Sequence, residues 1–247
     1  VEKELMKAGY FDIAKNYIIY RYEHTKEREE KKRETLEKLE ENSLFVTKRS
    51  GHRERFSPDK LRKTLAYHIH GYENDIDIEG VLAQVQTEIY EDMKTEEISR
   101  ALIMVLRSLI ERDPGYSVVA ARVLLSRIYK EVIGADVIDF SKLEEQHRDA
   151  FAASIRKAVS LQRLDPRMLE FNLLEIASKM ALDRDNKFVY LGLQTIYDRY
   201  LMRDSDTKWL LETPQMFWMR VAMGTALNEQ DKVAWTDQFY RIMSEFL

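Results

Sequence analysis

A strand–turn–strand–helix unit near residue 50 constrains the fold of this chain most. Two short strand-like runs, Leu44–Arg49 and Arg53–Ser57, flank a turn centred on Gly51. Alternation of apolar and polar side chains favours strands, and glycine supplies a tight turn. Pro58 suits the first turn of a helix, and the hydroxyl of Ser57 can cap that turn. The sequence therefore predicts a β-hairpin that leads directly into a helix.

Charged side chains are concentrated in this small unit. Lys48 and Arg49 end the first strand, Glu54 lies in the second, and Lys60 follows in the first helical turn. Helix N-termini and charge-assisted hydrogen bonds from Lys and Arg both favour bound phosphate groups. The hairpin and the helix start together predict a surface that can bind a triphosphate.

The rest of the chain is predicted to be mainly α-helical. It has 8 glycines and 4 prolines in 247 residues, and 45% of its residues are hydrophobic. The net charge of −4 gives no general affinity for nucleic acids. No apolar run has transmembrane length and no signal peptide is visible. We therefore expect a soluble, cytoplasmic protein with neither nucleic-acid nor membrane partners.

The chain contains no cysteine. This excludes disulfides, cysteine zinc sites and thiol chemistry within these residues. His68 and His70 are separated by two positions on a predicted helix, so they point in directions about 200° apart. One metal ion cannot easily bind both of them, and no metal site is expected.

Helical patterns follow the hairpin, separated by breaks that contain Asp, Asn, Gly or Pro. Thr95 is expected to cap one of these helices, with Glu96 and Glu97 in the first turn, where the helix dipole favours acids. The predicted helical segments are Lys60–His70, Val81–Met93, Thr95–Ile110 and Tyr116–Val132.

Two further segments make this region resemble an ATP cone, the regulatory nucleotide-binding domain of ribonucleotide reductases. Met93–Ser99 is similar to the second nucleotide-contacting segment of such domains. Ala120–Leu124, followed by Tyr129 and Lys130, is similar to their closing helix. The resemblance covers residues 44–134 and implies a four-helix bundle with a small β-hairpin or sheet as its lid.

The resemblance also implies a site for ATP or dATP. Cations from separate elements would neutralise the phosphates, and apolar side chains that also belong to the core would border the base. Thr95 and Ser99 would face the base, and Glu54 would contact the ribose or the cations of the site. Cones often carry Asn or Asp near the position of Ser57, and an acid or His at that of Ser99. The implied site residues are Val46, Lys48, Arg49, Glu54, Phe56, Ser57, Lys60, Leu61, Thr95, Ile98, Ser99 and Lys130.

The C-terminal part contains five characteristic segments, Phe188–Thr195, Asp198–Leu201, Glu212–Gln215, Met219–Gly224 and Phe239–Ser244. With these segments it resembles the all-α N-terminal domain of reductase large subunits. The predicted fold class is therefore mainly α, with an ATP cone followed by an all-α helical domain over residues 135–247. We interpret Asp183–Asp185 as a helix terminus with salt-bridged acids, and Trp209, Trp218 and Trp235 as core residues.

The first 43 residues differ from the rest. Gly9–Lys15 is similar to Gly115–Arg122, with an offset of one residue. This similarity predicts that residues 1–22 are the remnant of a preceding ATP cone, although two unrelated amphipathic helices can share such a pattern. Residues 23–43 are dominated by Glu, Lys and Arg at three- and four-residue spacings, which predicts a solvent-exposed helical linker.

The resemblance implies a function as the N-terminal regulatory part of the large subunit of a class I-like ribonucleoside-diphosphate reductase. ATP or dATP, with Mg²⁺, would be the allosteric effector and would control activity through oligomerisation. The implied partners are a radical-generating small subunit and further large subunits. Ribonucleotide reduction requires cysteines, so we expect no catalytic residue in this chain.

The sequence has three alternative interpretations. Glu212–Gln215 and Met219–Gly224 argue against an anaerobic reductase but do not exclude a fragment of a cobalamin-dependent one. A non-enzymatic regulatory or interaction module with an ATP cone is a second alternative. Nucleotide-sensing transcriptional repressors also carry a cone, but they pair it with a four-cysteine zinc ribbon, for which this chain has no cysteine.

Overall fold

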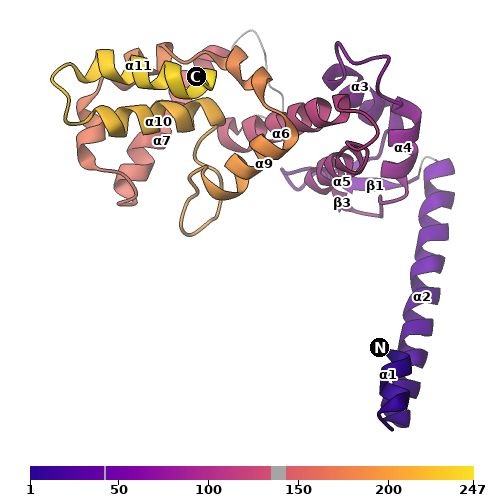
Figure 1. Cartoon of the computed structure of the whole chain (residues 1–247). Helices are drawn as coiled ribbons and strands as arrows, with labels where there is room; N and C mark the ends of the chain where they lie inside the picture. Colours follow the sequence, from indigo (N-terminus) through magenta and orange to yellow (C-terminus); the bar gives the residue numbers. More distant parts are fainter. Residues whose placement is uncertain (42, 135–142) are drawn as a thin grey trace. The chain divides into compact units, whose positions relative to one another are not determined.

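The computed structural model describes residues 1–41, 43–134 and 143–247. It is predominantly helical with a small three-stranded sheet (Figure 1). The predicted fold class, mainly α with a small sheet, is confirmed. Residue 42, near the end of the expected linker, and residues 135–142, with which the second domain is expected to begin, lie outside the described residues.

The described chain divides into two compact units. The first unit contains residues 1–67 and 77–105, and the second contains residues 68–76 and 106–247.

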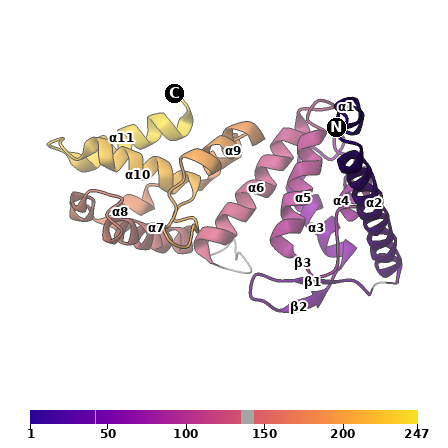
Figure 2. The same cartoon turned by 90° about the horizontal axis from the view of Figure 1, so that it is seen from below.

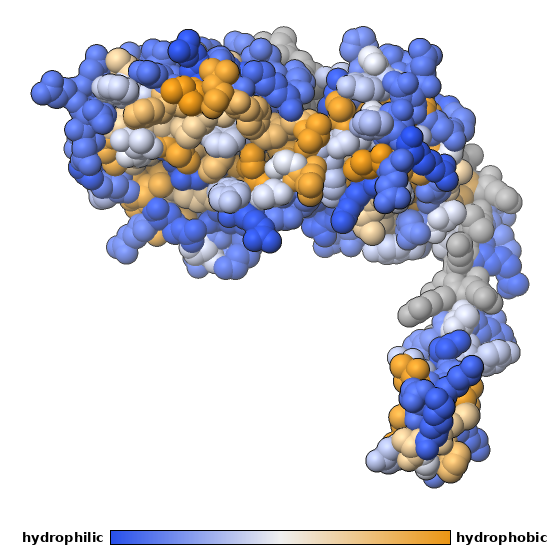
Figure 3. Space-filling model, viewed as in Figure 1, coloured by the Kyte–Doolittle hydropathy of each residue, from blue (hydrophilic) through white to orange (hydrophobic). Residues whose placement is uncertain are grey.

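The first unit begins with two helices that pack against each other, α1 (Glu2–Lys7) and α2 (Phe11–Glu40). Gly9 links them in the left-handed region, with φ of 82°. α2 continues through the charged segment as a single helix. Its first turns carry large apolar side chains that are exposed to solvent, and Figure 3 shows hydrophobic side chains beside hydrophilic ones at this end of the chain. These exposed side chains include Tyr10, Phe11, Ile13, Tyr17, Ile19, Tyr20 and Tyr22.

The sheet lies directly after α2 in the sequence. β1 (Phe45–Thr47) pairs with β2 (Arg53–Arg55) in antiparallel fashion, and the turn between them contains Gly51 with φ of 81°. The predicted hairpin is thus confirmed, with shorter strands. A third strand, β3 (Met93–Lys94), pairs with β1 in parallel fashion, so the strand order is β2-β1-β3.

The third strand corrects one prediction. The helix expected over Val81–Met93 is α4 (Ile78–Gln86), which ends earlier. The chain then turns through Asp92, which has φ of 61° and donates its backbone N–H to the carbonyl of Phe45 at 2.9 Å. The backbone N–H and C=O groups of this segment are hydrogen-bonded to β1, so they do not need the hydrogen bonds of a longer helix. The pairing with a distant strand therefore overrides the local helical pattern.

The helices that follow β2 and β3 begin close to the predicted positions. α3 (Pro58–His68) is capped as expected, because the N–H of Lys60 donates to the hydroxyl of Ser57 at 3.3 Å. α5 (Thr95–Ser108) includes Thr95 as its first residue. Its cap comes instead from Glu97, whose carboxylate accepts the backbone N–H of Lys94 at 3.0 Å.

The second unit is a layered set of helices around a continuous apolar core. In it α10 packs against α11, α6 against α9, and α7 against α8, and Figure 2 shows α10 and α11 side by side. The predicted closing helix is confirmed as α6. The elements are α6 (Gly115–Ile133), α7 (Leu143–Ser160), η2 (Pro166–Glu170), α8 (Leu173–Ser178), η3 (Leu182–Lys187), α9 (Tyr190–Arg199), α10 (Pro214–Ala226) and α11 (Lys232–Glu245). The core includes Phe151, Ile155, Met168, Ile176, Met216, Met219, Met223 and Tyr240.

The tryptophans follow the core prediction only in part. Trp218 is partly buried and packs against the core of the second unit. Trp209 and Trp235 are 50% and 39% exposed, so the prediction that they are core residues is wrong. Trp235 packs its ring on Phe239, one helical turn later on the surface of α11, at a centroid distance of 5.3 Å. Aromatic composition alone does not specify which helix face points inward.

Candidate functional site

Five charged side chains of the first unit form what we call the hairpin charge cluster: Lys48, Arg49, Glu54, Lys60 and Glu96. The carboxylate oxygen Oε2 of Glu54 lies 3.1 Å from Nζ of Lys48 and 3.1 Å from Nζ of Lys60. The guanidinium of Arg49 pairs with the carboxylate of Glu96 in the first turn of α5. The structure therefore brings together cations from the end of β1 and the start of α3, as the sequence predicts.

The sheet register explains this meeting point. Val46 stands opposite Glu54 in the antiparallel pair and beside Met93 in the parallel pair. Because β3 leads directly into α5, pairing of Thr47 with Lys94 places the first turn of α5 next to the end of β1. The N-terminal ends of both α3 and α5 consequently lie near the cluster, and helix N-termini favour anions.

Electrostatics within the cluster favour an ionised Glu54. Burial of this half-buried carboxyl opposes ionisation, but hydrogen bonds from Lys48 and Lys60 outweigh that effect and hold the pKa of Glu54 below its usual value. At neutral pH the cluster thus contains three cations and two carboxylates. Its surface therefore carries positive charge, and an incoming anion could replace the carboxylates of Glu54 and Glu96 as partners of the cations.

The other predicted site residues of the first unit lie around these charges. Ile98 is buried in the core of that unit, two residues after Glu96 on α5. Thr95 and Ser99 are half-buried on the same helix, and the hydroxyl of Ser99 donates to the carbonyl of Thr95 at 3.1 Å. The remaining apolar members of the predicted site, each at most 8% exposed, are Val46, Phe56 and Leu61.

Lys130 is the one predicted site residue in the second unit. It lies in the last turn of α6. Its predicted contact with nucleotide stays a prediction.

Sequence reasoning missed the acids that pair with the hairpin from the far side of the sheet. The guanidinium of Arg53 donates hydrogen bonds to Asp92 and to Glu91, each at 2.5 Å. It also lies over the ring of Phe45, with Cζ 4.4 Å from the ring centroid. The hydrogen bond to Asp92 is the main reason that the pKa of Arg53 is raised. The pairing of β3 with β1 brings three acids, Glu91, Asp92 and Glu96, to the hairpin. No local sequence pattern predicts that pairing.

Comparison with known proteins assigns both parts of the chain. Residues 44–131 match the model of the ATP cone domain, and residues 186–247 match that of the ribonucleotide reductase all-alpha domain. The whole chain aligns at 36% identity with the ribonucleoside-diphosphate reductase subunit alpha of Chlamydia trachomatis, of which it covers 23%. The subunits alpha of Helicobacter pylori and Enterobacteria phage T4 are 31% and 28% identical over 82% and 81% of this chain, which covers 24% and 26% of them.

This chain carries an ATP cone and the all-alpha domain of ribonucleotide reductases. It spans about a quarter of the length of the curated relatives that it matches. The hairpin charge cluster lies entirely within the residues matched to the cone.

In the all-alpha part, the run Glu212–Gln215 organises the buried polar groups. The carboxylate of Glu212 is 1% exposed and binds the guanidinium of Arg220 through two contacts of 2.7 and 2.8 Å. Thr213 caps α10, and its hydroxyl lies 2.6 Å from Nε2 of the buried His147. Pro214 is the first residue of this helix, and the amide of Gln215 donates to another buried acid. Each residue of the run therefore has a structural role.

That acid is Asp185, and it corrects an interpretation made from the sequence. Asp185 is 3% exposed, and its two carboxylate oxygens accept hydrogen bonds from the hydroxyl of Tyr129 at 2.5 Å and the amide of Gln215 at 2.7 Å. Arg184 instead pairs with Glu245, at 2.8 Å. Asp185 is therefore not salt-bridged within the described residues. Burial raises its pKa to about 7, against the effect of its two hydrogen bonds.

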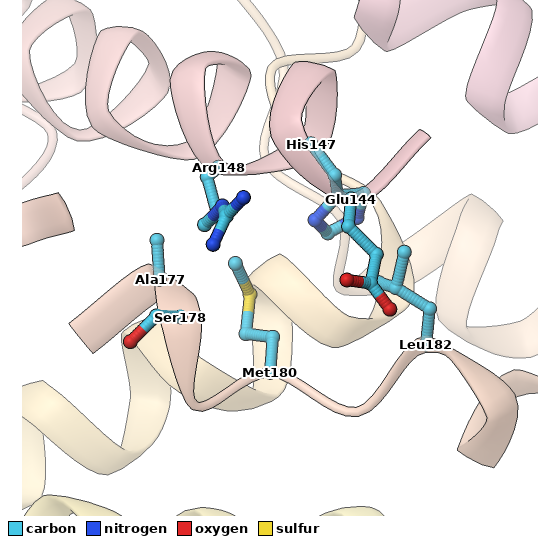
Figure 4. Close-up of a pocket in the computed structure, with 7 residues that line it drawn as sticks. All are labelled: Glu144, His147, Arg148, Ala177, Ser178, Met180 and Leu182. Carbon is cyan, nitrogen blue, oxygen red and sulfur yellow. The ribbon is translucent and has the colours of Figure 1, made fainter. Parts of the chain in front are cut away.

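A small cavity of about 90 Å³ lies beside α7 in the second unit. Figure 4 shows Glu144, His147 and Arg148 on one side of it and Met180 on the other. Burial lowers the pKa of His147 to about 4, so this side chain is neutral at pH 7. None of the predicted site residues lines the cavity.

Across residues 1–41, 43–134 and 143–247, no cluster of side chains could hold a metal ion, and no helix is long and apolar enough to cross a membrane.

Proposed function

We propose that this chain is the nucleotide-sensing N-terminal part of the large subunit of a class I-like ribonucleoside-diphosphate reductase. Its ATP cone binds ATP or dATP, with Mg²⁺, and the bound nucleotide controls the activity of the whole enzyme through oligomerisation. The observation that carries this proposal is the hairpin charge cluster, which combines three cations and two helix starts within the residues matched to the cone.

The chemistry of the cluster suits a triphosphate. A nucleoside triphosphate carries about four negative charges, and each charge-assisted hydrogen bond to phosphate contributes roughly 1.5–3 kcal/mol. Lys48, Arg49 and Lys60 supply such donors from the strand end and the helix start, and Lys130 is proposed as a fourth. The apolar residues Val46 and Ile98 would border the base, as in the predicted site.

The rest of the enzyme supplies the chemistry. The relatives matched are about four times as long as this chain, and the chain has no cysteine for radical reduction of a ribonucleotide. We propose that the large subunit works in the cytoplasm with a radical-generating small subunit and with further large subunits. Coupling between the cone and subunit association would be worth about 1–3 kcal/mol, the usual range for allosteric effects.

The same proposal extends to the residues before the cone. Residues 1–22 would be the remnant of a preceding ATP cone, and residues 23–43 a helical linker. Two observations support it. Apolar side chains on the first turns of α2 are exposed, and a helix of that composition is normally buried. The Chlamydia relative matches residues 1–43 together with the rest of the chain, whereas the Helicobacter and phage relatives match 82% and 81% of it.

Single substitutions test the phosphate contacts. Lys48→Ala and Lys60→Ala are each expected to weaken ATP binding about 30-fold, or about 2 kcal/mol, through loss of one phosphate contact. Lys63→Ala is the matched control, because Lys63 is an exposed lysine on the same helix as Lys60 and outside the cluster. Isothermal calorimetry of the three variants measures the effect. Unchanged affinity in both Lys48→Ala and Lys60→Ala would mean that the phosphates bind elsewhere.

A further inference from the structure

The buried His147 of the second unit has one ring nitrogen without a hydrogen-bond partner. Its side chain is 0% exposed. Nε2 lies 2.6 Å from the hydroxyl oxygen of Thr213, whereas Nδ1 has no partner among the described residues. A buried polar atom that lacks a partner is costly, and native proteins normally supply one. His147 also lines the cavity of about 90 Å³ beside α7, where such a partner has room to bind.

The contact with Thr213 determines which ring nitrogen carries the proton. Burial lowers the pKa of His147 to about 4, so the ring is neutral at pH 7 and only one nitrogen is protonated. The hydroxyl oxygen of Thr213 accepts the backbone N–H of Met216 as the cap of α10. Its own proton needs an acceptor, because Thr213 is fully buried, and Nε2 is the acceptor within reach. The ring proton is therefore assigned to Nδ1, which is a donor without an acceptor.

A second donor lines the same cavity. Arg148 follows His147 on α7, is half-buried and forms no ion pair with another described residue. Figure 4 shows its side chain pointing from α7 toward Met180. A guanidinium has only donors, and it suits the oxygen atoms of carboxylates and phosphates. The cavity exceeds the roughly 10–15 Å³ that one water molecule needs, so a larger group has room there.

We propose that this cavity binds a small oxyanion, such as inorganic phosphate or a short carboxylate, through Nδ1–H of His147 and the guanidinium of Arg148. One acid, Glu144, also lines the cavity, one turn before Arg148 on α7. Glu144 is exposed, so solvent screens its charge more strongly than that of the half-buried Arg148. An oxyanion has oxygens for both donors, whereas both donors repel a cation. The cavity therefore favours an anion.

The proposed anion site shares no residue with the hairpin charge cluster. The residues that line the cavity lie between positions 144 and 182, outside both ranges matched to the family models, 44–131 and 186–247. The inference is therefore independent of nucleotide binding by the cone. An anion that orders His147 also stabilises the cap of α10, because the hydroxyl of Thr213 donates to the same ring.

NMR of the ring nitrogens of His147 tests the proposal. The chain has five histidines, and His147→Gln identifies the signal, because glutamine keeps a polar group near the Nε2 position and removes Nδ1. Should that variant not fold, the signal is assigned through bonds from the backbone of His147 in the wild type. We expect a protonated Nδ1 at pH 7. Its signal should shift and saturate during titration with sodium phosphate or sodium acetate at constant ionic strength, and the tighter of the two anions identifies a tetrahedral or a planar ligand.

Two variants show whether the cavity holds the anion. Arg148→Gln should weaken binding about 10-fold, through loss of one charge-assisted contact. Arg156→Gln is the matched control, since Arg156 is an exposed arginine of α7 that does not line the cavity. Its affinity should stay within about twofold of the wild type.

The remaining outcomes would overturn the inference. No saturating shift at millimolar anion would mean that the cavity holds only ordered water. An equal response in Arg148→Gln, or a proton on Nε2 in place of Nδ1, would exclude the proposed contacts. Lys60→Ala removes a cation of the hairpin charge cluster, so loss of the shift in that variant would assign the anion to the cone. Failure of the chain to bind ATP would leave this test unchanged.

Discussion

The hairpin charge cluster and the Glu212–Arg220 pair hold opposite charges at similar distances but in different surroundings. In the cluster, Glu54 is 22% exposed and its partner Lys60 is 67% exposed. In the all-alpha domain, Glu212 is 1% exposed and Arg220 is 17% exposed. An exposed pair contributes about 0–1 kcal/mol, whereas removal of one partner from a buried pair costs about 3–5 kcal/mol. The comparison indicates that a ligand can replace the pairs of the cone, and that those of the all-alpha domain maintain its fold.

The largest expected effect comes from the buried pair. Glu212→Gln leaves the guanidinium of Arg220 without a compensating charge, and it should lower the free energy of unfolding by about 3 kcal/mol. Glu79→Gln is the control, because the guanidinium of Arg62 binds Glu79 in an exposed pair and its loss should cost less than about 1 kcal/mol. Urea denaturation followed by circular dichroism measures both. Equal losses in the two variants would mean that burial does not distinguish these pairs.

A pH dependence from Asp185 gives the next largest effect. Its pKa of about 7 in the folded chain exceeds the unfolded value of 3.8, so its contribution to stability is fully present below pH 3.8 and is lost as pH rises through about 7. Over this window the contribution falls by up to about 1.4 kcal/mol for each pH unit. Asp185→Asn should remove that slope, since asparagine does not ionise.

The control for this experiment lies two residues away. Asp183 is exposed, and its charge is the smallest of the causes that act on the pKa of Asp185, so Asp183→Asn makes the same change of charge with only a small effect on the buried carboxyl. Denaturation at several pH values between 4 and 8 should give nearly the wild-type slope for Asp183→Asn and a much flatter one for Asp185→Asn. The same slope in all three proteins would show that Asp185 does not take up a proton on folding.

The two regions also differ in how much of them the sequence could predict. The hairpin, the cap at Ser57 and the cations Lys48 and Lys60 depend on local patterns, and the structure has them where the sequence predicts them. The partner of Arg49, in contrast, is 47 residues away and is brought there by a parallel strand that the helical pattern concealed.

Burial of single polar residues was the hardest property to predict. Asp185 follows Asp183 and Arg184 in the sequence, a run that is typical of a surface helix end. Its hydrogen-bond partners lie 56 residues before it and 30 residues after it, so only the assembled helices show that it is enclosed. Composition and periodicity specify the apolar face of a helix, but they do not specify which polar side chain is enclosed with it.

Titration of the chain with ATP and with dATP by isothermal calorimetry shows whether the ion pairs of the cone mark a nucleotide site whose cations can exchange partners. We expect about one nucleotide bound per chain. We also expect stabilisation against thermal unfolding of about 2.7 kcal/mol when the nucleotide is at about 100 times its dissociation constant. The absence of both heat and a thermal shift at millimolar nucleotide would contradict this expectation. Binding that is as tight in Lys60→Ala as in the wild type would contradict it as well.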